Sequence, residues 1–387
     1  MKILVLTDDR IGEVMAGSAL RAWELARALA AAGHQVRVSG GPSSTVPGPG
    51  PPLEDRPAWR WADAVLSPPW SLPPHTFFSK RILIVDGATP LLAELDSMEQ
   101  NTLVRRRRRT AGARLPLVAA WADALLVAGE NQRKWWSQRL GRKRPDLPII
   151  DLPFGVPENP PSDQRAEIPG VPRHHAVVLW WGGVWPWLDL DTLLAARARL
   201  GGAPLSIVIP VAPRPGDSTP TFGPSDLDQI CRHHGLAPPQ VVGLREWAPY
   251  RERHRLLNRS SLLAVLHRPV PEADLSFRTR ALDGLWAGVP LLLTEGGEVS
   301  ELARRHGWGG VIRPGDVAGT AAALELLLSP REQERCRKNL LRAREHWTWQ
   351  RLAEPLVEIL PALPRIPREN LLPALARAAL ILAGGGL

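Results

Sequence analysis

The stretch from Asp274 to Leu293, DLSFRTRALDGLWAGVPLLL, holds a clear change of secondary structure. A polar loop leads into a helical pattern over 281–287, and Gly288-Val289-Pro290 closes the helix because glycine allows a left-handed turn and proline cannot continue it. The apolar run Leu291–Leu293 then predicts a buried strand. A helix that leads directly into a buried strand is typical of a crossover between parallel strands.

The same alternation extends through both halves of the chain and predicts two parallel sheets. A helix from about 19 to 32 separates the first two strands, which makes a βαβ opening. Strands are predicted in the first half at Ile3–Leu6, Val36–Val38, Ala64–Leu66, Arg81–Val85, Ala124–Val127 and Ile149–Ile150, and in the second half at Ala176–Trp181, Leu205–Ile209, Gln240–Val242, Leu262–Val265, Leu291–Leu293 and Val311–Ile312. We therefore predict an α/β fold of two Rossmann-like, doubly wound domains that face a cleft.

The domain boundaries follow from a break in this pattern. At 387 residues the chain is too long for one ordinary core. The alternation stops at Val156–Pro161 and restarts at Ala176, so we predict an N-terminal domain over 1–160 and a C-terminal domain over 161–347. Residues 348–387 are expected to form a helix and a tail that pack back on the N-terminal domain. The apolar run Ala374–Ala383 in this tail is too short to span a membrane, and it is expected to dock on a domain or on a lipid surface.

The net charge of +9 includes five consecutive arginines, Arg105–Arg109, and a second basic cluster at Arg139, Arg142, Lys143 and Arg144. Such a surface attracts phosphates in nucleic acids, anionic lipids or nucleotide sugars, although charge runs are also commonly solvated faces. No recognition motif accompanies the charge, so we expect no nucleic-acid partner.

Several classes of protein and site are excluded or disfavoured by single features. The two cysteines, Cys231 and Cys336, lack the spacing of a disulfide framework or a zinc site. The histidines show no metal-ligand spacing, so no metal is expected. The apolar start, Met1–Leu6, runs straight into a polar turn without the features of a signal peptide, which predicts a cytoplasmic protein.

Ligands of parallel α/β sheets bind outside the carboxyl ends of the strands, so the loops that follow the strands hold the candidate binding residues. Glycine allows close approach of the backbone to a ligand, and the N–H groups at a helix start favour an anion. A helix that begins near Ser276 would place these N–H groups beside Arg278 and Arg280, with Asp283 about two turns further along. The residues expected to bind a phosphorylated ligand are Gly17, Gly182, Gly183, Ser276, Phe277, Asp283, Gly296 and Gly297.

The segment Leu275–Asp283 and the following Asp283–Pro290 resemble the E-x7-E segment and Gly-x-Pro of family-4 retaining glycosyltransferases of the GT-B fold. The segments 8–26, 128–133 and 153–157 resemble the same family, so the likeness covers nearly the whole chain. It implies a metal-independent, retaining enzyme without a cofactor, whose substrate is a nucleotide sugar. It also implies that the domain over 1–160 is the acceptor-side domain and that the domain over 161–347 binds the nucleotide sugar. By this resemblance, Asp283 accepts hydrogen bonds from the donor ribose.

The chain departs from the family pattern at two places. Leu275 occupies the first acidic position, and the region Gly182–Trp187 has tryptophans instead of the Arg and Lys that neutralise the leaving diphosphate. We expect Arg278 and Arg280 to take over that catalytic role. Two carboxylates of the first domain, Asp86 and Glu130, are candidates to contact the acceptor or the donor sugar.

Other functions remain open at this point. An epimerase or a phosphorylase would also use two Rossmann-like halves, although no compelling cofactor lysine for a phosphorylase is evident. A non-catalytic relative that binds nucleotide sugars or acts as a scaffold is favoured by Leu275 and by the missing Arg and Lys. The acceptor could be a glycan, a lipid-linked sugar or a small molecule. The basic first domain would suit peripheral contact with the anionic inner face of a membrane, in the assembly of envelope polysaccharide.

Overall fold

The computed structural model describes residues 1–72, 81–140, 144–213, 222–363 and 371–383. It contains two compact units. The first unit comprises Met1–Phe154, Leu275–Phe277 and Trp349–Leu387, and the second comprises Gly155–Asp274 and Arg278–Thr348. The division falls after Phe154, slightly before the predicted boundary at residue 160, and the C-terminal segment groups with the first unit. Arg142 and Lys143 of the second basic cluster lie outside the described residues.

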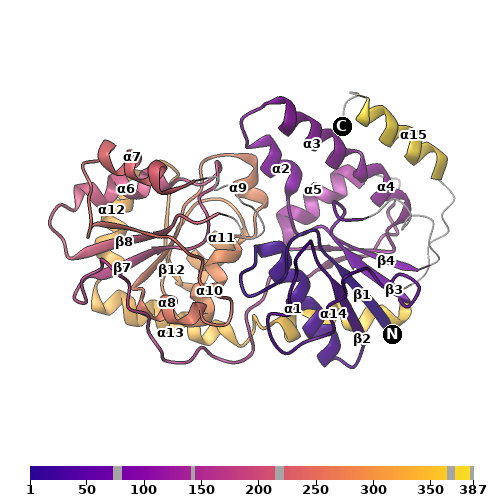
Figure 1. The fold of residues 1–387 in the computed structure, drawn as a ribbon, viewed down its shortest axis with the longest axis horizontal. Helices are drawn as coiled ribbons and strands as arrows, with labels where there is room; N and C mark the ends of the chain where they lie inside the picture. Colours follow the sequence, from indigo (N-terminus) through magenta and orange to yellow (C-terminus); the bar gives the residue numbers. More distant parts are fainter. Residues whose placement is uncertain (73–80, 141–143, 214–221, 364–370, 384–387) are drawn as a thin grey trace. The chain divides into compact units, whose positions relative to one another are not determined.

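The first unit is built on a six-stranded parallel sheet in the order β2-β1-β3-β4-β5-β6. Its strands are β1 (Lys2–Leu6), β2 (Gln35–Ser39), β3 (Ala64–Ser67), β4 (Ile82–Asp86), β5 (Ala124–Val127) and β6 (Ile149–Asp151). Its helices are α1 (Gly17–Ala31), α2 (Leu91–Asp96), α3 (Thr102–Gly112), α4 (Arg114–Trp121), α5 (Glu130–Leu140), α14 (Trp349–Ile359), followed by a 3-10 turn at Leu360–Ala362, and α15 (Leu371–Leu382). Helices α1 and α14 pack together on one face of the sheet, and α4 and α5 cover the other (Figure 1).

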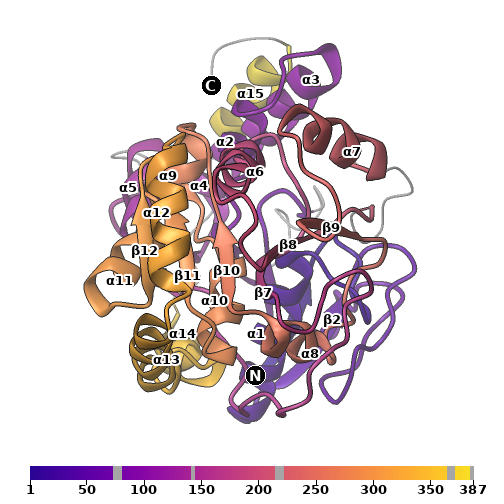
Figure 2. The ribbon, with the colours of Figure 1, turned by 90° about the vertical axis from the view of Figure 1, so that its left-hand side faces the viewer.

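The second unit is also built on a six-stranded parallel sheet, with the strand order β12-β11-β10-β7-β8-β9. Its strands are β7 (Ala176–Trp180), β8 (Leu205–Pro210), β9 (Val241–Leu244), β10 (Leu262–Val265), β11 (Leu291–Thr294) and β12 (Gly309–Ile312). Its helices are α6 (Leu190–Arg199), α7 (Pro224–His233), α8 (Arg253–Arg259), α9 (Pro271–Leu275), α10 (Thr279–Ala287), α11 (Glu298–His306), α12 (Val317–Leu327) and α13 (Pro330–Arg344). Figure 2 looks onto this unit, and its strands follow one another in this order across the view, from β12 on the left to β9 on the right. The predicted class, two Rossmann-like parallel sheets, is confirmed.

The order of the second sheet reverses between β7 and β10, which are neighbours. In doubly wound sheets such a reversal opens a crevice at the carboxyl ends of the strands, because the loops on either side of it lead away to opposite faces. The loops after β7, β10 and β11 therefore surround the natural ligand position of this unit.

The stretch that links α10 to β11 shows why its glycines are needed. Gly288 ends the helix in the left-handed conformation with a φ of 70°. A Cβ atom on Gly284 would lie 2.5 Å from a methyl group of Leu291 and 2.9 Å from the carbonyl oxygen of Val289. Only glycine lets the helix approach the strand this closely, and the strand itself is fully buried.

Candidate functional site

The loop after β7 approaches the start of α10 through Gly182 and Arg280. Gly182 has a φ of 86°, and a Cβ atom added there would lie 3.1 Å from Nε of Arg280. The guanidinium of Arg280 thus lies directly against the glycine backbone. Two residues predicted separately from the sequence are therefore brought together at the carboxyl edge of the second sheet.

Arg280 is a cation without a partner inside the described part of the chain, where it forms neither an ion pair nor a hydrogen bond. Its side chain is half-buried. Burial lowers its pKa to about 10, although the nearby Glu272 carboxylate opposes the shift, so the group stays protonated at neutral pH. A partly desolvated guanidinium with unused donors favours an anionic ligand, since phosphate and carboxylate oxygens match its geometry.

Asp283 lies one turn further along α10 and is held from two sides. Its Oδ2 accepts a hydrogen bond of 2.6 Å from Nε1 of Trp181, and its Oδ1 pairs with Nε of Arg253 at 2.9 Å. The guanidinium of Arg253 in turn stacks on the rings of Tyr250 and Trp286. The carboxylate is fixed in orientation yet 23% exposed, and it retains lone pairs for further donors such as hydroxyl groups.

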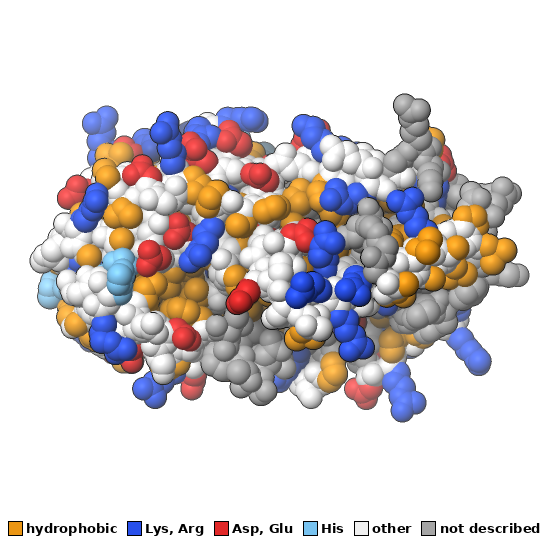
Figure 3. All heavy atoms as spheres, turned by 90° about the horizontal axis from the view of Figure 1, so that it is seen from above, with side chains coloured by type: hydrophobic (Ala, Val, Ile, Leu, Met, Phe, Trp, Pro, Cys, Tyr) orange, Lys and Arg blue, Asp and Glu red, His pale blue; other side chains and the backbone are white. Residues whose placement is uncertain are grey.

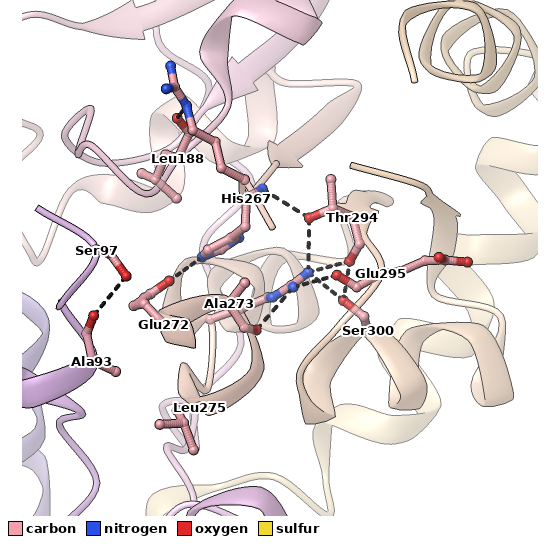
Figure 4. Close-up of polar contacts among 12 residues, drawn as sticks. Ala93, Ser97, Leu188, His267, Glu272, Ala273, Leu275, Thr294, Glu295 and Ser300 are labelled. Carbon is pink, nitrogen blue, oxygen red and sulfur yellow. Dashed lines mark hydrogen bonds and ion pairs between the residues drawn. The ribbon is translucent and has the colours of Figure 1, made fainter. Parts of the chain in front are cut away.

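Arg278 is engaged inside the second unit, which gives no support to the expectation that it neutralises a diphosphate. It begins α10 in the left-handed conformation, with a φ of 49°, and is only 2% exposed. Its guanidinium donates to Ser300 Oγ at 2.6 Å and to the carbonyl oxygens of Thr294, Glu295 and Ala273 (Figure 4). These contacts brace the loops after β10 and β11 against each other, because one planar cation bonds to both.

His267 and Glu272 form a buried pair in the loop after β10 that sequence reasoning missed (Figure 4). Nε2 of His267 lies 3.5 Å from Oε2 of Glu272, and the two side chains are 3% and 4% exposed. Burial, and then the positive charges of Arg278 and Arg280, hold the pKa of His267 well below its usual value, so the imidazole is neutral. Its only signal in the sequence was its place directly after a buried strand.

The loop after β11 contains the predicted pair of glycines. Gly296 and Gly297 both have positive φ, 91° and 70°, and Gly297 caps α11. A Cβ atom at Gly296 would come within 2.9 Å of Oδ1 of Asp274. This position therefore requires glycine, and the N-terminus of α11 begins beside the N-terminal region of α10 that Arg278 holds in place.

Tryptophans surround the second glycine of the β7 loop. A Cβ atom at Gly183 would touch the indoles of Trp185 and Trp247 at 3.3 and 3.5 Å, and Trp185 stacks on Trp187. Nε1 of Trp247 donates to the carbonyl oxygen of Ala212, which follows β8. The region that lacks the family's Arg and Lys is thus an aromatic wall at the edge of the sheet.

The candidates in the first unit are arranged differently. Asp86 is buried, with Oδ2 bonded to Nε of Arg21 at 2.7 Å and Oδ1 to the backbone N–H of Ala88. This arrangement gives no support to the expectation that it contacts a sugar, because its oxygens are engaged inside the unit. Glu130, at the start of α5, is exposed and lies 3.5 Å from Lys134. Gly17 is the exposed first residue of α1, as a role at a helix start requires.

Two residues expected to bind the donor, Ser276 and Phe277, lie before α10 instead of inside its first turn. The helix begins at Thr279, later than predicted, and these two residues group with the first unit. Phe277 is 4% exposed and stacks on Phe154, which gives no support to the expectation that it binds the donor. The left-handed turn at Arg278 separates them from the helix.

Within the described ranges, no three His, Cys, Asp or Glu side chains gather in a way that could hold a metal ion. The helices of the same ranges are all too short or too polar to cross a bilayer.

Several solved structures of glycosyltransferases are similar to this chain. The chain is similar to sucrose-phosphate synthase from Thermosynechococcus elongatus (13% identity, 94% of this chain and 99% of that chain, TM-score 0.65). It is also similar to HepE from Anabaena in complex with UDP and glucose (15% identity, 94% and 100%, TM-score 0.66). A third similar structure is WaaG, a glycosyltransferase involved in lipopolysaccharide biosynthesis (16% identity, 92% and 98%, TM-score 0.63).

No protein-family model and no curated protein matches the sequence. At these identities the structural likeness establishes the fold, which is the predicted GT-B glycosyltransferase fold.

Proposed function

We propose that this protein is a glycosyltransferase that moves a sugar from a nucleotide-sugar donor to a glycan, lipid-linked or small-molecule acceptor. The observation that supports it most is Arg280, a half-buried guanidinium without a partner in the described chain, at the crevice of the second sheet. HepE, which has the same fold, binds UDP and glucose. The donor would occupy the second unit, with its diphosphate against Arg280 and the starts of α10 and α11.

The proposed mechanism is based on the negative charge that develops on the leaving group. The bond between the anomeric carbon and the diphosphate oxygen breaks, and the negative charge of the leaving nucleoside diphosphate grows. Arg280 and the backbone N–H groups of the two helix starts stabilise that charge without a metal ion. The acceptor oxygen bonds to the anomeric carbon on the face that the diphosphate leaves, which retains the configuration, and the acceptor proton departs with the diphosphate.

Asp283 would accept hydrogen bonds from the ribose hydroxyls of the donor. Its carboxylate is already oriented by Trp181 and Arg253, so little rotamer freedom would be lost on binding. The aromatic wall of Trp185 and Trp247 would flank the same ligand.

A donor screen tests this proposal. The melting temperature is measured in EDTA with UDP-, GDP-, ADP- and dTDP-sugars, because a ligand that binds only the native state must raise it. We expect one donor to stabilise the wild type, and Arg280→Met and Asp283→Asn to lose most of the shift. Arg305→Met, which removes an exposed arginine at the other end of α11, is the matched control and should keep it. No shift with any donor, either in EDTA or with Mg²⁺ in its place, would contradict the proposal, and a shift that appears only with Mg²⁺ would contradict metal independence.

A non-catalytic relative is the second candidate, supported by Leu275 at the first acidic position of the motif. The carbonyl oxygen of this residue accepts a hydrogen bond from Gln132, and its side chain supplies no carboxylate. Release of nucleoside diphosphate from the stabilising donor, with and without an acceptor extract, separates the two candidates. Binding without any release would favour the non-catalytic one.

The basic first unit would also suit a protein that works at the anionic inner face of a membrane on a lipid-linked acceptor. Residues 105–109 support this proposal because four of these five arginines are exposed.

A further inference from the structure

Helix α15 (Leu371–Leu382) packs on the first unit through small side chains. Ala374, Ala378 and Ile381 are buried, and Ala378 and Ile381 pack in one cluster with Ala113 and Leu117. Their spacing places them on one face of the helix, one turn apart. The helix lies against α4 and α3, so this face is the one turned to the protein.

The opposite face of α15 is also apolar, which is unusual for a helix at a protein surface. Leu372, Leu375, Leu380 and Leu382 are 78%, 38%, 66% and 52% exposed. The helix has one charged residue, Arg377. A surface helix normally turns polar side chains to water, and a helix that is apolar all round is normally covered.

The exposed leucines of α15 form a group and are not spread singly over the surface. The large exposed hydrophobic residues of the described chain are Met1, Val46, Leu103, Leu326 and the four leucines of α15. A single short helix thus supplies half of them, and Leu103 lies on the neighbouring α3. Single exposed hydrophobic residues need no explanation, but a gathered group marks an interaction surface.

Helix α3, beside α15, supplies a dense positive charge. It contains Arg105–Arg109, and Asp96 pairs with Arg108. In the described parts of the chain, Arg105, Arg106, Arg107 and Arg109 are exposed and form no ion pair. Figure 3 shows the result, with hydrophobic side chains gathered over α15 at the right-hand end and Lys or Arg side chains beside them.

We propose that α15 and α3 form a docking surface for an anionic lipid bilayer. In this arrangement α15 lies in the plane of the interface with its four exposed leucines among the acyl chains, and the arginines of α3 contact lipid phosphates. Apolar insertion and attraction to anionic headgroups are the two contributions that hold interfacial helices on membranes. This surface deepens the membrane contact proposed above for residues 105–109, on which it rests, and it does not depend on the transfer reaction.

A second copy of the chain is a poorer occupant of this surface. A twofold contact would bring the same patch of each copy together, so the two arginine runs would face each other. Like charges at close range repel, and no acidic cluster among the exposed residues of α3 or α15 offsets them. The charge therefore favours an anionic partner, and the exposed leucines favour one with an apolar interior.

Flotation of the full chain with vesicles tests the proposal. The probes are vesicles of neutral phosphatidylcholine and of a 7:3 mixture with anionic phosphatidylglycerol, at low and high salt. We expect the wild type to float with the anionic vesicles at least tenfold better than with the neutral ones, and the difference to shrink in high salt because the charges are screened. Both Leu372→Ser/Leu375→Ser/Leu380→Ser and Arg105→Gln/Arg106→Gln/Arg107→Gln should bind anionic vesicles at least tenfold more weakly.

Two control variants match these changes elsewhere in the chain. Leu326→Ser removes an exposed leucine from α12, and Arg251→Gln/Arg305→Gln/Arg313→Gln removes the same charge from exposed positions of the second unit. Both should bind like the wild type, and unchanged melting temperatures would show that the α3 and α15 variants are folded.

Three outcomes would overturn the proposal: no flotation of the wild type, equal flotation with both vesicle types, or equal losses in the test and control variants. Sedimentation of the protein without lipid tests a fourth outcome that would overturn the proposal. If the wild type is a dimer and the triple leucine variant is a monomer, the occupant of the surface is a second copy of the chain. The donor-induced melting shift should be the same in all these variants, so failure here and failure of the proposed transfer reaction are distinguishable.

Discussion

Both sheets have six parallel strands, but the charged side chains at their carboxyl edges are paired differently. In the first unit Asp86 at the end of β4 is bonded to Arg21, whose remaining donors reach the carbonyl oxygens of Leu152 and Pro153. In the second unit Asp283 is also paired, but Arg280 has no partner within the described residues. A buried ion pair with all its groups satisfied holds loops together, whereas an unsatisfied cation is available to a ligand.

The same contrast appears in the side chains that connect the loops. Gln132 ties the first unit's loops together through Ala128, Ala88 and the carbonyl oxygen of Leu275. Arg278 performs the corresponding task in the second unit. Two parallel six-stranded sheets therefore do not imply two ligand sites, and we expect the edge with the unsatisfied charged group to be the one that binds a ligand.

The largest effect is expected on stability, when the buried ion pair of the first unit is broken. Asp86→Ala leaves Arg21 buried without its carboxylate, and the loss of one partner of a buried pair costs about 3–5 kcal/mol. Urea unfolding should show this decrease in the free energy of unfolding. Because the pair is structural, donor binding by the folded fraction should be unchanged. A stable Asp86→Ala protein with weakened sugar transfer would reverse the contrast between the two edges.

Arg280→Met should give the next largest effect, with the opposite signature. Removal of a group that stabilises developing charge typically costs about 100- to 1,000-fold in rate. We expect kcat/KM for donor turnover to fall by about this factor while the melting temperature without ligand changes little, since no hydrogen bond or ion pair among the described residues is lost. Arg280→Lys should recover part of the rate. A wild-type rate in Arg280→Met would remove Arg280 from the reaction.

Sequence periodicity predicted the strands and the class of fold because both depend on local apolar patterns. Every predicted strand corresponds to a strand of the structure. The glycines after β7 and β11 were also predicted from the sequence, because positive φ angles and close approach of other groups favour glycine.

The pairing of charges could not be found in this way. Trp181 and Asp283 are 102 residues apart in the sequence, so no local pattern connects them. Arg278 and Arg280 looked equivalent, but the left-handed backbone at Arg278 turns its side chain inward. Arg253 and Trp247 were overlooked for the same reason, because their partners lie on other elements.

Loss of the contacts of Arg278 should have a smaller effect, on both stability and donor affinity. Arg278→Met removes the bonds to Ser300 and to the loop carbonyls, so both the free energy of unfolding and the position of the two helix starts should suffer. We expect about tenfold weaker donor binding, measured by calorimetry, together with a lower melting temperature. Arg278→Lys keeps the charge but not the planar fork, and it should restore the melting temperature more than the affinity. Unchanged affinity in Arg278→Met would show that the brace does not position the ligand.

The smallest effect concerns pH and the buried His267. Its pKa in the folded protein is well below the usual 6.5, so below about pH 6.5 the unfolded chain binds a proton that the folded one excludes. This contribution to stability is present above pH 6.5 and is lost as the pH falls, by up to about 1.4 kcal/mol per pH unit. His267→Asn should flatten that slope in urea unfolding between pH 6.5 and 5. His34 and His175, whose pKa values are also lowered by burial, add slopes of the same sign, so His175→Asn is the control. An identical slope in wild type and His267→Asn would mean that the imidazole is not held neutral, and that the loop after β10 opens to water in acid.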